Sequence, residues 1–217
     1  MKVSTDSCLF GAWVADKIHH EKNILDIGAG TGLLSLMLAQ KSQAKIDAVE
    51  IEQACYHQMC ENILASPWAE KCNSFNQDIR QFYSDKKYDL IISNPPFYEN
   101  QLRSDKEGIN LARHDDGLQL KDLFHEVNRL LTTDGKFFLL LPSYRKEECI
   151  KTALSFNMHP NALTDIKQTP NHKSFRTLFC FALYEQAITS EVIIIKENDN
   201  SYSPEFSAML KDYYLFL

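Results

Sequence analysis

The residues Asn94-Pro95-Pro96-Phe97 lie just beyond the apolar run Tyr88–Ile92. Proline cannot donate to a sheet ladder, and the residue before a proline is pushed out of the helical region. The four residues therefore end a strand, either as a plain turn or as part of a site. An asparagine oxygen and a proline carbonyl accept hydrogen bonds, and the fixed φ angles of proline hold such acceptors in place. At the end of a strand in an α/β sheet, these residues stand where a second substrate would bind.

A glycine-rich stretch, DIGAGTG, joins a strand-like segment to a helix-like one. It begins at Asp26 and contains Gly28, Gly30 and Gly32. Glycine lets the backbone turn sharply and approach a ligand closely. Glu50 ends the next predicted strand, about 20 residues further on, where a carboxylate can bind both hydroxyls of a ribose. The alternative is a glycine-rich turn beside unrelated acids.

The spacing of this loop is G-x-G-x-G rather than the G-x-G-x-x-G of dinucleotide sites. A pyrophosphate would be repelled by Asp26, whereas a cationic cofactor without phosphates would not. S-adenosylmethionine (SAM) fits, because it carries a ribose, an adenine, an amino acid and a sulfonium. Asp78 closes a third strand-like segment, where its carboxylate could accept a hydrogen bond from the adenine amino group.

Strand-like and helix-like segments alternate along the chain, which predicts a mostly parallel sheet with helices on both faces. Ligands of such sheets bind at the carboxyl ends of the strands, where all the residues above are expected. The predicted strands are Asn23–Gly28, Ala44–Glu52, Cys72–Asp78, Lys87–Ser93, Gly135–Pro142, Ala162–Ile166 and Thr177–Glu185. The predicted helices are Leu33–Ser42, Gln53–Ala65, Leu120–Leu131, Glu147–Phe156 and Ser203–Phe216.

Length and composition predict one globular domain over residues 1–217, with 44% hydrophobic and 24% charged residues. No apolar stretch approaches the roughly 20 residues that span a bilayer, and no secretion signal is recognisable. We therefore expect a cytoplasmic protein. The six cysteines form no Cys-x-x-Cys pair and the seven histidines have no metal-ligand spacing, so no structural metal is expected.

The net charge of −6 argues against a protein held on nucleic acid by overall charge. A local basic segment, Lys167–Arg176, nevertheless carries three positive side chains, His172 and no acid. This segment could be a solvated loop, or it could contact phosphates. Because no acid in the segment compensates them, we predict that Lys173 and Arg176 contact the phosphates of a nucleic acid.

The motifs DIGAGTG, Glu50, Asp78 and NPPF together resemble those of the class I SAM-dependent methyltransferases. In that class, Asn-Pro-Pro-Tyr/Phe marks enzymes that methylate an amino group conjugated to a planar system, which implies that Phe97 stacks on that system. Three further segments are similar to the bacterial tRNA1(Val) adenine-37 N6-methyltransferases. These segments are Lys2–Trp13, Ala112–Phe124 and Tyr202–Leu215.

The resemblance implies a Rossmann-like fold with a central, mostly parallel seven-stranded sheet, acting as a monomer on tRNA. Residues 1–22 would form a segment that closes over the cofactor through Thr5 and Asp6, although either could instead cap a helix. Residues 186–217 would be a C-terminal extension. Arg113 and His114 would contact RNA, or else pair with neighbouring aspartates. The chain departs from the family at Ser4 and Ser7, where glycines are usual, and at Phe97, where tyrosine is frequent.

Other functions share this chemistry and stay open. The same motif occurs in methyltransferases of ribosomal RNA guanine N2, of DNA adenine and of protein glutamine. A nucleic-acid-binding module without turnover is a further alternative, against which Asp26, Glu50 and Asn94 speak. The N-terminal block and the C-terminal tail favour the tRNA enzyme.

Overall fold

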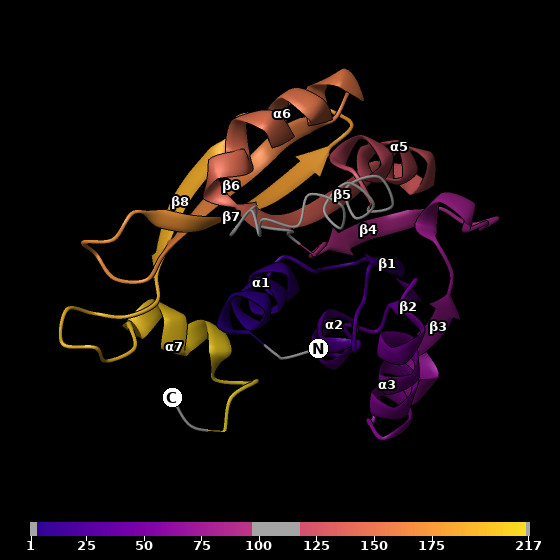
Figure 1. Cartoon of the computed structure of the whole chain (residues 1–217), viewed down its shortest axis with the longest axis horizontal. Coiled ribbons are helices and arrows are strands. Elements are labelled where there is room, and N and C mark those ends of the chain that lie inside the picture. Colours follow the sequence, from indigo (N-terminus) through magenta and orange to yellow (C-terminus); the bar gives the residue numbers. More distant parts are fainter. Residues whose placement is uncertain (1–3, 97–117, 216–217) are drawn as a thin grey trace, which may run out of the picture.

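The computed structural model describes residues 4–96 and 118–215, which form a layered α/β fold (Figure 1). The strands are β1 (Asn23–Ile27), β2 (Lys45–Glu50), β3 (Cys72–Asn76), β4 (Tyr88–Ser93), β5 (Leu131–Pro142), β6 (His159–Lys167), β7 (Ser174–Ala182) and β8 (Thr189–Ile194). The helices are α1 (Thr5–Ala15), α2 (Leu33–Lys41), α3 (Gln53–Leu64), α5 (Leu120–Leu130), α6 (Lys146–Ser155) and α7 (Pro204–Leu210). Short 3-10 helices are η1 (Ala69–Lys71), η2 (Ile79–Gln81) and η3 (Ser143–Arg145).

The strands form one sheet in the order β3-β2-β1-β4-β5-β7-β6-β8, and β7 runs antiparallel to both its neighbours. In the parallel part, Ile27 of β1 lies opposite both Val49 of β2 and Ser93 of β4. These three strands therefore end at the same edge of the sheet. The glycine loop, Glu50 and Asn94 follow at that edge, as the alternation of elements predicts.

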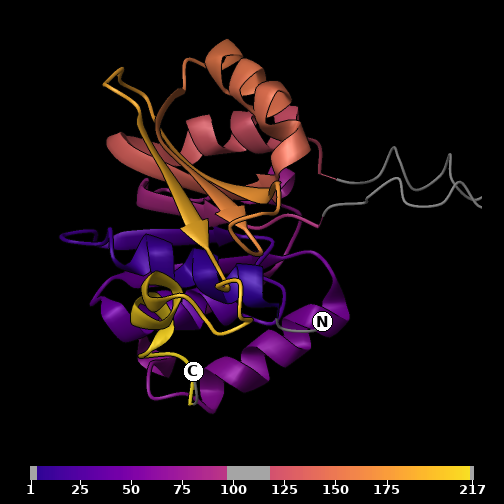
Figure 2. The same ribbon diagram turned by 90° about the vertical axis from the view of Figure 1, so that its left-hand side faces the viewer.

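Helices cover both faces of the sheet (Figures 1 and 2). Side chains of α1, α2, α3 and α7 pack in one buried apolar cluster, and those of α5 and α6 in the other. Helix α1 is buried from Cys8 to Ala15, so it is a core element rather than a surface helix. Its Trp13 ring meets Phe138 of β5 edge-on at 5.6 Å. This packing fixes the first turn of α1 beside the strand ends.

The structure differs from the predictions in the number of strands and in several element boundaries. The described residues form eight strands rather than seven, because β8 adds to β6 as a parallel strand. Strand β5 begins at Leu131 rather than Gly135, and its pairing with β4 is irregular over the intervening residues. Helix α7 ends at Leu210 because the next residues turn back, with the amides of Tyr213 and Tyr214 bonded to the Leu210 carbonyl. Among the described residues, no helix is long and apolar enough to cross a membrane.

Candidate active site

The glycine loop leaves β1 in a left-handed backbone conformation that suits glycine. Gly28 has a φ of 70°, and a Cβ there would face open space. Gly32 has a φ of 83°, and a Cβ there would lie 3.0 Å from Cγ of Met59. The amide of Gly28 donates to the Val49 carbonyl at 2.9 Å. The loop is thus fixed against β2, with open space above its first glycine.

Glu50 lies at the edge of the sheet where the parallel strands end, and its carboxylate also binds the glycine loop. Its Oε2 accepts from the amide of Gly30 at 2.7 Å, and its Oε1 accepts from the amide of Glu52 at 2.8 Å. The side chain is 7% exposed. Each carboxylate oxygen keeps capacity for a further donor. The sequence pattern predicted a ribose contact for Glu50, and its bond to the loop is a structural role that the pattern did not reveal.

Asp26 is fully buried at the end of β1, and only one of its oxygens is satisfied. Oδ2 accepts from the amide and hydroxyl of Ser35, at 3.1 and 2.7 Å. Oδ1 has no hydrogen-bond partner among the described residues. Burial raises the pKa of Asp26 to about 7, with the charge of Glu50 adding to the rise and Ser35 opposing it. A buried, unsatisfied carboxylate oxygen is a suitable acceptor for an ammonium group, so this residue fits the amino end of SAM.

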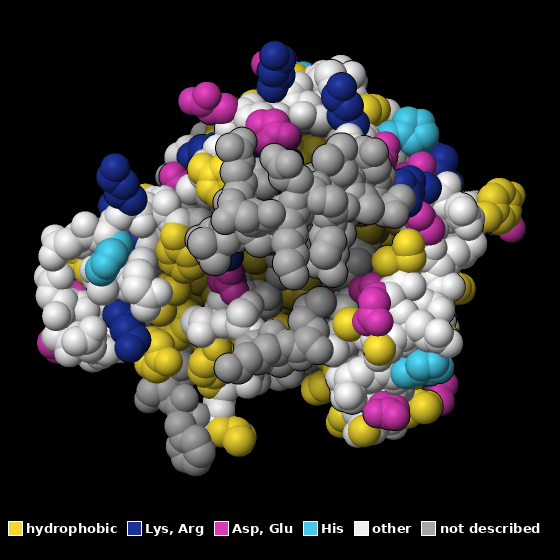
Figure 3. All heavy atoms as spheres, in the orientation of Figure 1, with side chains coloured by type: hydrophobic (Ala, Val, Ile, Leu, Met, Phe, Trp, Pro, Cys, Tyr) yellow, Lys and Arg dark blue, Asp and Glu magenta, His cyan; other side chains and the backbone are white. Residues whose placement is uncertain are grey.

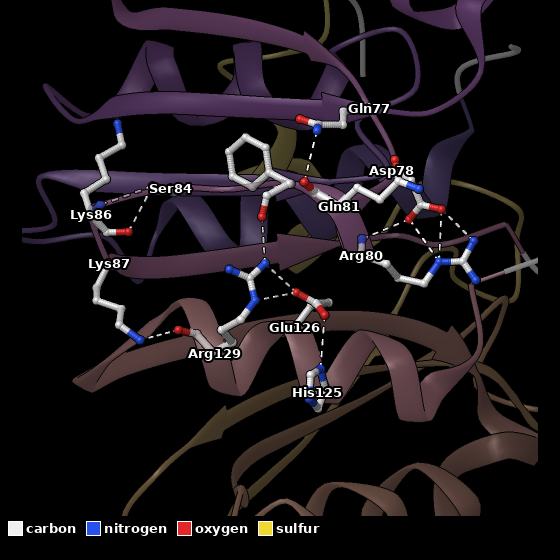
Figure 4. Close-up of polar contacts among 11 residues, drawn as sticks. Gln77, Asp78, Arg80, Gln81, Ser84, Lys86, Lys87, His125, Glu126 and Arg129 are labelled. Atoms are coloured by element: carbon white, nitrogen blue, oxygen red, sulfur yellow. Dashed lines mark hydrogen bonds and ion pairs between the residues drawn. The ribbon is translucent and has the colours of Figure 1, made fainter.

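Asp78 lies just beyond β3, where it begins η2 and binds Arg80 (Figure 4). Arg80 donates from Nε to both carboxylate oxygens, at 3.1 and 3.0 Å, and from Nη2 at 2.6 Å. These hydrogen bonds hold the pKa of Asp78 below its ordinary value. Arg80 was not among the predicted site residues. The available signal was an arginine two positions after an acid that begins a helix.

Ile51 is an exposed apolar side chain that directly follows Glu50 at the same edge. It is 61% exposed, which is unusual beside a strand whose residues Ile46 to Glu50 are buried. A flat ring bound next to Glu50 could pack on it. The sequence analysis did not single out Ile51, and the signal was an isoleucine placed after the last buried residue of a strand.

Asn94 leaves β4 half-buried, with its amide group directed at α1. Nδ2 donates to Oγ of Ser7 at 2.9 Å, and Oδ1 has no hydrogen-bond partner among the described residues. Before it, Oγ of Ser93 donates to the Ile27 carbonyl at 2.8 Å and ties β4 to β1. Pro95 is half-buried and Pro96 is exposed. The predicted stacking residue Phe97 lies outside the described residues.

The first turn of α1 lies near these strand ends but is not capped as the sequence suggested. Ser4 occupies the N-cap position, without a capping bond from its side chain, so neither Thr5 nor Asp6 is the N-cap residue. Asp6 Oδ1 nevertheless accepts from the amide of Ser7 in the first turn, at 3.1 Å. Thr5 is exposed. Asp6 accepts from Nε of Arg176 on β7 at 2.9 Å.

The Asp6–Arg176 ion pair changes the interpretation of the basic segment Lys167–Arg176. Arg176 is compensated by an acid from a distant part of the chain, so it is not a free phosphate ligand. Lys173 is exposed between β6 and β7, where Figure 3 shows basic side chains at the left-hand end of the molecule. Arg113 and His114 lie outside the described residues. No cluster of residues that could hold a metal occurs in 4–96 and 118–215.

The strand order, the glycine loop and the acids at the strand ends define a SAM-dependent methyltransferase fold. The family model for the methyltransferase small domain matches residues 7–155. Among solved structures, a predicted O-methyltransferase from Agrobacterium tumefaciens is 18% identical, with a TM-score of 0.74 over 94% of this chain and 95% of that one. The glycopeptide N-methyltransferase MtfA, in complex with SAM, is 11% identical, with a TM-score of 0.63 over 82% of this chain and 94% of that one. These likenesses concern the fold.

Sequence comparison identifies the particular family. A protein of Pseudoalteromonas translucida is 38% identical over 99% of this chain and 92% of its own length. A protein of Yersinia enterocolitica is 35% identical over 99% of this chain and 86% of its own length. Both are named tRNA1(Val) (adenine(37)-N6)-methyltransferase. This chain belongs to the tRNA1(Val) (adenine(37)-N6)-methyltransferase family.

Proposed function

We propose that this protein transfers a methyl group from SAM to the exocyclic N6 of adenine 37 in the anticodon loop of tRNA1(Val). The observation that carries the proposal is the similarity to proteins of that name over 99% of the chain. The position of Asn94, next to the glycine loop at the common strand edge, supports it.

Asn94 and Pro95 would accelerate the reaction by aligning the substrate amine. The exocyclic nitrogen of adenine is a weak nucleophile because its lone pair is delocalised into the ring. Hydrogen bonds from its two N–H groups to Asn94 Oδ1 and to the Pro95 carbonyl would let the nitrogen pyramidalise and direct its lone pair. Pro95 and Pro96 hold these acceptors in position, and Phe97 would stack on the base, a contact worth about 1–3 kcal/mol.

The cofactor side would use the acids at the ends of β1, β2 and β3. SAM supplies an electrophilic methyl group on a sulfonium. Asp26 Oδ1 would accept from the ammonium group, Glu50 from the ribose hydroxyls and Asp78 from the adenine amino group. Gly28, Gly30 and Gly32 provide close backbone approach. Thr5 and Asp6 at the start of α1 would close over the bound cofactor.

A base must leave its stack to reach this edge, which costs least in a loop of single-stranded nucleotides. Lys173 is the proposed phosphate contact on the β6–β7 side. Arg113 and His114 are further proposed RNA contacts. Arg176 can reach a phosphate only by sharing or exchanging Asp6. We further propose that the protein acts as a monomer, in the cytoplasm where tRNA is modified.

The test is to incubate the protein with labelled SAM and total tRNA from a strain that lacks this protein. We expect label in N6-methyladenosine, and mass mapping should place it at position 37 of tRNA1(Val). Label in N2-methylguanosine, or label in ribosomal RNA alone when it is offered, would contradict the proposal. A protein that binds SAM without labelling any RNA would also contradict it.

A further inference from the structure

Two serine hydroxyls connect the catalytic asparagine to helix α1. Asn94 Nδ2 donates to Ser7 Oγ at 2.9 Å, across 87 positions of the sequence. Ser7 Oγ in turn lies 2.8 Å from Ser4 Oγ. Both serines belong to the start of α1, whose body from Cys8 to Ala15 is buried. The chain Ser4–Ser7–Asn94 therefore ends at the N-terminus of a helix whose body is buried in the core.

The orientation of the Asn94 amide decides what the site offers to an amine. The oxygen and the nitrogen of an amide have nearly the same size, so sterics alone do not select one end. With Oδ1 toward the substrate, the site accepts an N–H bond. With Nδ2 toward the substrate, two N–H donors would oppose each other. In this chain, an acceptor behind the side chain, Ser7 Oγ, can hold Nδ2 away from the substrate.

A lone serine hydroxyl does not make that choice, because it can donate to Oδ1 as readily as it accepts from Nδ2. The second hydroxyl offers the Ser7 proton another acceptor, and the Asn94 amide is oriented with Nδ2 toward Ser7 Oγ. When the Ser7 proton is directed to Ser4 Oγ, the Ser7 oxygen is left as an acceptor toward Asn94. Ser4 is exposed, so its own proton can be given to water.

The start of α1 is held firmly enough for this role. Asp6, between the two serines, pairs with Arg176 of β7 at 2.9 Å, and the amide of Cys8 donates to the Ser4 carbonyl at 3.1 Å. Ser7 is half-buried, as is Asn94. A rotation of Ser7 away from Asn94 would break the Ser4 contact as well.

We propose that Ser7, with Ser4 behind it, is a positioning residue that keeps Oδ1 of Asn94 directed at the substrate amine. The inference rests on the proposed function, because it assumes that Asn94 accepts a hydrogen bond from that amine. Ser7 touches neither the substrate nor the cofactor in this proposal. Its effect passes entirely through Asn94.

The test is a pair of Ser7→Ala variants, one in the wild-type protein and one in an Asn94→Asp background, measured on tRNA1(Val). Ser7→Ala should lower kcat by about two- to tenfold, as expected for one hydrogen bond, with KM for tRNA and Kd for SAM within twofold. Ser7→Thr keeps the hydroxyl and should restore most of the loss. Ser155→Ala, at an exposed position on α6, is the matched control and should leave kcat unchanged.

The Asn94→Asp background separates orientation from helix stability. A carboxylate presents an oxygen whichever way it is turned, so adding Ser7→Ala to Asn94→Asp should change kcat less than twofold. An equal loss in both backgrounds, or no loss in either, would overturn the positioning role while leaving the proposed function intact. A wild type that makes no N6-methyladenosine would overturn the proposed function and this inference together.

Discussion

The site lies at the edge of the sheet where the parallel strands end, and its two halves are fixed in different ways. One half is formed by the acids of β1 and β2, and the other by Asn94 after β4. On the β1–β2 half, the acids are fixed by main-chain amides of nearby turns: Gly30 and Glu52 donate to Glu50, and Ser35 donates to Asp26. On the β4 half, Asn94 is fixed by one hydroxyl of a helix far away in the sequence. The cofactor half is built locally, whereas the amine half depends on how α1 packs on the sheet.

The difference implies that the two halves can be damaged separately. Loss of a side chain on the β4 half should slow methyl transfer and leave SAM binding intact. Loss of an acid on the β1–β2 half should weaken SAM binding, with turnover recovered at saturating cofactor.

The largest effect is expected from Asn94→Ala, which removes an acceptor that aligns the amine. We expect kcat on tRNA1(Val) to fall by about a hundredfold or more, comparable to the loss of one preorganised polar group in other active sites. Single-turnover rates with saturating SAM measure this step. Asn94→Asp is the matched control, because it keeps an oxygen at the same position and should retain more activity. Wild-type turnover in Asn94→Ala would remove this residue from the catalytic role.

Asp26→Asn should weaken SAM binding by about ten- to a hundredfold, the usual worth of a hydrogen bond to a charged group. The asparagine oxygen can still accept from Ser35, so the fold should survive. Calorimetric titration measures Kd, and kcat at saturating SAM should change much less. An unchanged Kd would show that the free oxygen of Asp26 does not receive the ammonium group.

The raised pKa of Asp26 predicts a pH dependence on the same half. Only the ionised carboxylate attracts an ammonium group, and its pKa is about 7. SAM affinity should therefore rise by about fivefold between pH 6 and pH 7, a range in which the amino group of the cofactor stays protonated. Asp26→Asn should show no such rise. A flat profile in the wild type would contradict an ionisation near pH 7.

The same shift has a consequence for stability with the opposite sign. The folded pKa lies above the value of about 4 expected in the unfolded chain. The contribution of Asp26 to stability is thus fully present below pH ~4 and is lost as pH rises through about 7. Urea unfolding without SAM should show Asp26→Asn gaining stability relative to the wild type between pH 5 and pH 8. A constant difference over that range would argue against the raised pKa.

The smallest effect is expected from Lys173→Ala, which changes the RNA-facing surface and neither half of the strand edge. Loss of one phosphate contact should raise KM for tRNA by a few-fold and lower the magnitude of the salt slope by about 1, with kcat unchanged. Lys151→Ala, at an exposed position on α6, is the matched control. An unaltered salt slope in Lys173→Ala would exclude the contact.

The strand ends could be predicted from the sequence because their signals are local. A buried run followed by glycines, an acid or Asn-Pro-Pro indicates both the end of a strand and its chemistry. Since the strands are parallel, these residues had to meet at one edge. Glu50 and Asn94 are accordingly close to where the pattern predicts them.

The contacts that pattern reading missed join residues far apart in the sequence. Ser7 meets Asn94, and Asp6 meets Arg176, only because α1 is buried against the sheet. An apolar helix at the start of a chain gives no indication of which strand end it will reach. Strand β8 was missed for a different reason: at the sheet edge only part of it is buried, so its pattern is ambiguous.

The separation of the two halves is tested most directly by titrating Asn94→Ala with SAM in a calorimeter. The account predicts a Kd within about twofold of the wild-type value, because amides of the β1–β2 half hold the Glu50 and Asp26 carboxylates that receive the cofactor. A loss of affinity as large as that of Asp26→Asn would contradict it. In that case Asn94 and the acids would form one interdependent site.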